Sequence, residues 1–141
     1  MFSLIWFCVH AFTDCQPTLI PLRGSKVYVL DGSNSYSLTW NYNTDGRTIK
    51  EVQLKYSGRG NFDITVAGRT QAGQLQVNPA SGYSASRISF DGSLSGNVGN
   101  ITFRIYNIAQ SDNGIFKCDL SFNSFNPPDI HSSIELVAVG K

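Results

Sequence analysis

The stretch SDNGIFKC, residues Ser111 to Cys118, places a tight corner directly before a strand. Asp112 can accept hydrogen bonds from nearby backbone amides, and Gly114 can adopt a positive φ that other residues avoid. Phe116 and Cys118 then share a face, because alternate side chains of a strand point to the same side of a sheet. The stretch therefore predicts a corner followed by a strand that buries one face.

Short apolar runs bounded by Gly, Asn, Asp, Ser or Pro recur along the whole chain, and none keeps a helical period. The run 36–42 alternates strictly between apolar and polar residues, which is typical of a half-buried strand. The other expected strands are Lys26–Leu30, Ile49–Tyr56, Phe62–Val66, Leu75–Val77, Arg87–Phe90, Ile101–Ile108, Gly114–Phe122 and Ser133–Val139. Eight or nine short strands with polar turns predict an all-β sandwich or barrel.

The composition of the 141-residue chain argues against several classes of function. Its net charge of +1, with 15% charged residues, provides no basic field for nucleic acid or for an anionic membrane surface. Only two histidines, His10 and His131, accompany three cysteines, and no serine stands in a nucleophile elbow. We therefore expect no enzyme activity, no metal and no small-molecule cofactor.

The first twelve residues are apolar and too few to span a bilayer. They predict a secretory signal peptide over residues 1–14, followed by one domain over residues 15–141, with a buried N-terminal strand as the alternative. The chain is expected to be secreted or to lie on the extracellular face of the plasma membrane. It is either a small secreted domain or the first domain of a longer receptor, whose membrane attachment would then lie beyond Lys141.

The order of these features resembles the variable type of the immunoglobulin superfamily. The matching runs are 38–40 as strand B, 52–54 as strand C, 87–90 as strand D, 101–105 as strand E, 111–118 as the corner and strand F, and 133–139 as strand G, with 62–66 and 75–77 in place of strands C′ and C″. The resemblance implies an immunoglobulin-like β-sandwich of two antiparallel sheets with Greek-key connections. It also implies a salt bridge between Arg87 and Asp112, either partly buried or exposed.

Three positions depart from the family pattern. Phe116 replaces the corner tyrosine, Leu54 replaces the strand C tryptophan, and Trp40 replaces the strand B cysteine. We expect Trp40 to pack against Cys118 and to fill the space of the missing bridge and ring. A tryptophan in the strand B run LTWNY (38–42), with DNGIFKC (112–118) downstream, is similar to immunoglobulin-like domains of cnidarian surface proteins, including distal domains of hydroid allorecognition receptors.

The cysteines leave two alternatives open. Cys8 would leave with the signal peptide, and a bridge between Cys15 and Cys118 would close a loop of about 100 residues. In the other alternative Cys118 is a buried free thiol, and Cys15 is lost, free or paired with another chain.

The resemblance places a contact loop between strands F and G, where Pro127 and Pro128 limit the conformations to be ordered on binding. Phe125 is expected either to be exposed there or to fold back onto the sheet. The predicted contact residues of this loop are Phe122, Phe125, Asn126, Pro127, Pro128 and Ile130, and a second, weaker region holds Lys55, Arg59 and Phe62. Asn100 begins an Asn-Ile-Thr sequon, and a glycan there would keep its face out of an interface.

The resemblance implies an extracellular domain that recognises proteins, in cell–cell adhesion or in self/non-self recognition. The expected partner is a protein, including another copy of this chain, bound through the C–C′–F–G sheet and the F–G loop. The alternative functions are a secreted defence module that binds a microbial or carbohydrate ligand, and a structural spacer.

Overall fold

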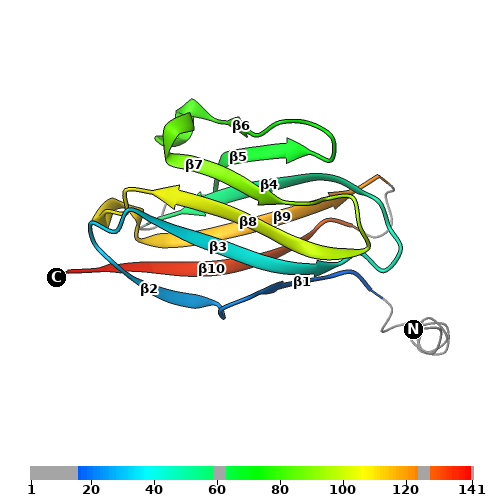
Figure 1. Ribbon diagram of the computed structural model, residues 1–141, viewed down its shortest axis with the longest axis horizontal. Coiled ribbons are helices and arrows are strands. Elements are labelled where there is room, and N and C mark those ends of the chain that lie inside the picture. Colours follow the sequence, from blue (N-terminus) through cyan, green and yellow to red (C-terminus); the bar gives the residue numbers. More distant parts are fainter. Residues whose placement is uncertain (1–15, 59–62, 124–127, 141) are drawn as a thin grey trace.

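The computed structural model describes residues 16–58, 63–123 and 128–140. In these residues the chain forms two β-sheets that face each other as two layers (Figure 1). The four-stranded sheet has the order β1 (Thr18–Pro21), β3 (Ser35–Asn43), β8 (Val98–Tyr106) and β7 (Ile88–Gly92). The six-stranded sheet has the order β2 (Lys26–Leu30), β10 (Ile130–Val139), β9 (Gly114–Phe122), β4 (Ile49–Ser57), β5 (Ile64–Thr70) and β6 (Gln76–Val77).

Short 3₁₀ turns, not α-helices, accompany the strands of the described ranges. They are η2 (Pro79–Ser81), η3 (Ala85–Arg87) and η4 (Gln110–Asp112). None of the helical segments in these ranges has the length and apolar character that a membrane crossing requires.

All nine expected strands are present, with shifted ends. β2 and β9 have the predicted bounds, whereas Arg87 ends the turn η3 and strand β7 begins one residue later. β10 begins at Ile130, because residues 130–132 pair with residues 118–120 of β9. His131, expected in a loop, therefore lies in a strand.

Two features of the sheets differ from the prediction. The sequence pattern does not predict β1, since this strand has only four residues, follows Pro17 and ends at Pro21. The chain then crosses to the other sheet, where β2 runs parallel to β10. The expectation of entirely antiparallel sheets is wrong for this pair, because the crossing brings β2 beside β10 in the same direction.

The core lies between the sheets and is built from alternating residues, as the sequence pattern predicts. In β3 the side chains of Leu38, Trp40 and Tyr42 are buried, while Asn41 is exposed. Trp40, Phe103 and Phe116 are the largest fully buried side chains. The side chains of the inner faces are thus buried in the core, so only the outer faces of the sheets and the loops are available to bind another molecule.

Candidate functional site

The outer face of the six-stranded sheet carries charged side chains from neighbouring strands. β4 and β9 are antiparallel, with Gln53 opposite Asp119 and Lys55 opposite Lys117. Lys55 Nζ lies 2.7 Å from Asp119 Oδ2, and Asp119 Oδ1 lies 3.8 Å from His131 Nδ1 of β10. Asp119 thus connects cationic or titratable groups from the strands on both sides of it.

A second ion pair on this face joins Lys117 to Asp63, which stands just before β5. The hydrogen bond to Asp63 raises the pKa of the Lys117 ammonium group above its ordinary value. Lys117 therefore stays charged at physiological pH, and the face presents both signs of charge side by side.

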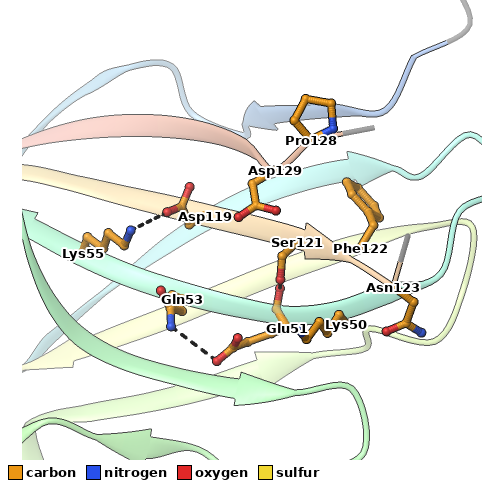
Figure 2. A pocket seen from close by; sticks show the side chains of 10 residues that line it. All are labelled: Lys50, Glu51, Gln53, Lys55, Asp119, Ser121, Phe122, Asn123, Pro128 and Asp129. Atoms are coloured by element: carbon orange, nitrogen blue, oxygen red, sulfur yellow. Dashed lines mark hydrogen bonds and ion pairs between the residues drawn. The ribbon is translucent and has the colours of Figure 1, made fainter. Parts of the chain in front are cut away.

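A shallow groove of about 490 Å³ runs over these strands (Figure 2). Its wall is strengthened by hydrogen bonds from Gln53 Nε2 to Glu51 Oε2 (3.3 Å) and from Ser121 Oγ to the Glu51 carbonyl (3.3 Å). The lining residues are Lys50, Glu51, Gln53, Lys55, Asp119, Ser121, Phe122, Asn123, Pro128 and Asp129. Binding sites for drug-sized ligands are mostly apolar and enclosing. A polar, open groove instead suits a protein surface or another polar ligand.

The predicted contact residues separate into three groups. Lys55 and Pro128 line the groove, as does Phe122, although its side chain is largely buried. Ile130 is half-buried and packs against the core, so only part of its side chain is accessible for a contact. The predictions for Phe125, Asn126, Pro127, Arg59 and Phe62 lie outside the described residues.

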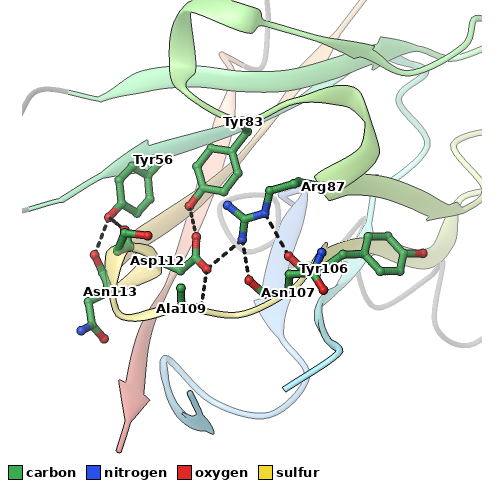
Figure 3. A network of polar contacts seen from close by, with 9 residues as sticks. Tyr56, Tyr83, Arg87, Tyr106, Asn107, Ala109, Asp112 and Asn113 are labelled. Carbon is green, nitrogen blue, oxygen red and sulfur yellow. Dashed lines mark hydrogen bonds and ion pairs between the residues drawn. The ribbon is translucent and has the colours of Figure 1, made fainter. Parts of the chain in front are cut away.

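The corner before β9, at residues 111–114, is held by a buried carboxylate (Figure 3). Asp112 is only 1% exposed and accepts three hydrogen bonds, from Tyr83 Oη (2.8 Å), Arg87 Nη2 (2.9 Å) and the Ala109 amide (2.8 Å). The Arg87 guanidinium also lies 5.0 Å from the centre of the Tyr83 ring. The expected Arg87–Asp112 salt bridge is confirmed, in its partly buried form.

The hydroxyl missing at Phe116 is supplied from the neighbouring strand. Tyr56 of β4 donates its hydroxyl to the carbonyl of Asn113, and its ring centre lies 4.9 Å from that of Phe116. Gly114 has φ +151, and a Cβ there would meet the Tyr56 ring at 2.7 Å. Gly114 thus makes room for the tyrosine. No pattern in the sequence signals these roles of Tyr56 and Tyr83, because the roles depend on contacts between residues far apart in the chain.

No protein-family model matches this chain, and no curated protein matches its sequence. Solved structures do match. A structure of murine CRIg has a TM-score of 0.65 at 14% identity, covering 89% of this chain and 98% of that one. A chain from a study of cell-adhesive interactions of VGSC beta subunits has a TM-score of 0.62 at 18% identity, covering 82% and 92%. A chain from a structural study of T-cell specificity and activation by the bacterial superantigen toxic shock syndrome toxin-1 has a TM-score of 0.68 at 13% identity. The match covers 87% of this chain and 99% of that one.

The fold is an immunoglobulin-like β-sandwich. At these identities the comparisons show the fold alone. Two short strands, β5 and β6, extend the six-stranded sheet beyond β4, as in the variable type of this fold. The predicted fold class is confirmed, and the narrower similarity to cnidarian and hydroid surface proteins stays a prediction.

The core of this immunoglobulin-like domain has Trp40 and Cys118 on facing sheets, both fully buried in one cluster. Leu54 lies directly opposite Cys118 in the β4–β9 register. Cys118 is bonded to no other cysteine of the described ranges. Cys15 lies outside the described residues, so its bridge to Cys118 stays a prediction.

The Cys118 thiol gives stability a pH dependence. Burial, with a smaller contribution from the charge of Asp119, raises the pKa of this thiol well above its ordinary value. Above about pH 8.5 the unfolded chain loses the thiol proton while the folded chain keeps it, so the free energy of unfolding falls by up to about 1.4 kcal/mol per pH unit.

Chemical denaturation at several pH values between roughly 7.5 and 9.5 measures this dependence. The range stays below the ordinary tyrosine pKa of about 10, so tyrosines contribute little to the slope. The Cys118→Ala variant is the control and is expected to give a flatter curve. If Cys118 were bridged to Cys15, the slope would appear only after a reductant is added.

The Asn100 side chain is exposed on the outer face of the four-stranded sheet, opposite Asn41 of β3. Thr102, the third residue of the sequon, shares a hydrogen bond with Thr39 (2.9 Å). A glycan on Asn100 would cover the four-stranded sheet and leave the groove on the other sheet open.

Proposed function

We propose that this immunoglobulin-like domain is an extracellular protein-recognition domain, acting in cell–cell adhesion or self/non-self recognition by homophilic binding. The observation that carries the proposal is the open polar groove on the outer face of β4 and β9, which continues onto the residues flanking the β9–β10 loop. A rigid sheet that presents such a surface beside a loop is the usual arrangement of a recognition site.

The charges of the groove support a second copy as the partner. Lys50 and Lys55 line it together with Glu51, Asp119 and Asp129. A surface that carries positive and negative charges can pair each of them with an opposite charge on a second, identical surface, which favours association. The same surface disfavours binding of a partner whose charges are all of one sign. One of the similar structures concerns multimeric cell-adhesive interactions, so the fold is compatible with such contacts.

Aggregation of beads coated with the domain tests the proposal. The wild-type coat is expected to aggregate beads, and Gln53→Arg combined with Ser121→Arg should abolish aggregation, because two bulky cations would fill the groove. Asn41→Arg is the matched control on the opposite sheet, where Asn41 is exposed. Unchanged aggregation by the groove variant would refute this site. Beads that stay dispersed while the domain binds glycans in the same groove would instead favour the secreted defence module.

A further inference from the structure

The two sheets have four edge strands, and three of them carry features that discourage pairing with another chain. β1 follows one proline and ends in another, β6 has two residues and is followed by Asn78 and Pro79, and β7 ends in Asp91 and Gly92. Natural edge strands are commonly protected by prolines, charges and short length. β2 differs, because it reads KVYVL and has no charge, proline or glycine after Lys26.

The backbone of β2 has a free side. The Glu135 amide donates to the Ser25 carbonyl (2.7 Å), and the Asp31 amide donates to the Val139 carbonyl (2.7 Å). Backbone groups alternate in direction along a strand. The groups of Val27 and Val29 therefore point to β10, whereas those of Lys26, Tyr28 and Leu30 point outward.

No strand of the described chain pairs with this outward side of β2. The Leu30 carbonyl already accepts from the amide and the hydroxyl of Ser33, at 3.1 and 2.6 Å. The remaining groups on this side are the amides of Lys26, Tyr28 and Leu30 and the carbonyls of Lys26 and Tyr28. They form the ladder that a further strand would use. In Figure 1, β2 lies at the lower margin of the molecule, beneath β10.

An apolar patch accompanies the free edge. Tyr28 is 64% exposed and Leu30 is 56% exposed, on the outer face of the sheet. Val137 and Val139 of β10, both half-buried, are their direct neighbours in register. Ile115 of β9, 45% exposed, lies opposite Glu135, two residues along β10 from Val137. Contiguous exposed apolar side chains on a soluble domain mark a contact surface.

We propose that two copies of this domain pair through β2, antiparallel, about a two-fold axis at Tyr28. The result is one continuous sheet with six strands from each copy. The two Tyr28 residues exchange a pair of backbone hydrogen bonds, and each Leu30 amide donates to the Lys26 carbonyl of the other copy. Four backbone hydrogen bonds thus join the copies.

The sequence of β2 suits an identical partner. In this register Tyr28 faces itself, and an aromatic cross-strand pair is favourable. Lys26 faces Leu30, and the two Lys26 residues are separated by four positions, or roughly 13 Å along the strands. Each Lys26 keeps its own Glu135 at 3.9 Å. No like charges oppose each other, so the contact is self-complementary, as a two-fold interface requires.

The pairing goes beyond the proposed function and does not depend on it. A two-fold axis perpendicular to the sheet keeps the outer faces of both copies on the same side. Both grooves would then face one direction, and a dimer could bind two partners at once with the gain in avidity that bivalence gives.

Analytical ultracentrifugation of the soluble domain tests the pairing. In the background of Gln53→Arg with Ser121→Arg, which removes the proposed groove contact, a reversible monomer–dimer equilibrium is expected. Tyr28→Lys should weaken it at least about tenfold, since a lysine would face a lysine at the axis. Val98→Lys is the matched control, because Val98 is also 64% exposed but lies on the four-stranded sheet. Gln53→Arg with Ser121→Arg should leave the dimer intact while abolishing bead aggregation, which separates this contact from the groove.

A cysteine scan tests the register. The Cα atoms of a hydrogen-bonded antiparallel pair lie about 5.5 Å apart, within the range of a disulfide. Tyr28→Cys should therefore form a crosslinked dimer on oxidation, above the level of the unsubstituted chain, and Leu30→Cys should not. A monomer at all concentrations, an equal effect of Val98→Lys, or crosslinking of Leu30→Cys alone would overturn the proposal. Circular dichroism confirms that each variant is folded.

Discussion

Trp40→Ala is expected to lower the free energy of unfolding by about 3–5 kcal/mol, the range for removal of a buried tryptophan from a core. Trp40 is fully buried, and it stands where the family resemblance places a cysteine. Removing the indole would open a cavity in the core between the two sheets. Urea denaturation measures the change, and Val98→Ala on an exposed position should stay within about 0.5 kcal/mol.

The Trp40→Phe variant separates the volume of the indole from its polarity. The Trp40 Nε1 group is buried without a hydrogen-bond partner among the described residues. A buried donor without an acceptor is unfavourable by about 1–3 kcal/mol, so its loss should offset part of the lost volume. We expect Trp40→Phe to cost less than half of what Trp40→Ala costs. Equal costs would show that the indole N–H is satisfied in solution and that this reading of the core is wrong.

The alternating pattern of the sequence is sufficient to predict most strands and their buried faces. Leu38, Trp40 and Tyr42 point inward as their spacing predicts, because a strand with one buried face needs an apolar residue at every second position. The partner of Asp112 could be named only through the family resemblance, since Arg87 is 25 positions away. The buried face of a single strand can therefore be predicted from its own sequence, whereas a contact between strands is predicted only through resemblance to a known family.

The remaining features depend on register, which the sequence alone does not show. Lys55 was named as a contact residue, but its ion pair with Asp119 follows only from the β4–β9 alignment. The hydroxyl at the corner comes from Tyr56, which lies 57 positions before its acceptor Asn113 in the sequence, and no local motif signals it. The parallel pairing of β2 with β10 likewise arises from a crossing between sheets.

Asp112→Ala is expected to lower the free energy of unfolding by about 3 kcal/mol or more, as removal of one partner of a buried ion pair does. The substitution leaves Arg87 without its counter-ion and Tyr83 without an acceptor for its hydroxyl. In the folded wild-type chain, burial and next the hydrogen bond to Asp112 raise the pKa of this hydroxyl, so Tyr83 is a neutral donor to the carboxylate. Glu135→Ala, which removes a carboxylate from the exposed pair with Lys26, should cost less than about 1 kcal/mol.

A double-mutant cycle with Tyr83→Phe shows whether the corner acts as one network. Tyr83→Phe alone removes one hydrogen bond to a charged group, worth about 1.5–3 kcal/mol. Once Asp112 is alanine, the hydroxyl has no acceptor, so its removal should cost little or become favourable. The coupling energy is therefore expected to lie between about 0.5 and 3 kcal/mol. Additive costs, or an Asp112→Ala cost no larger than that of Glu135→Ala, would mean that the corner is held by packing of Tyr56 on Gly114 instead of by the carboxylate.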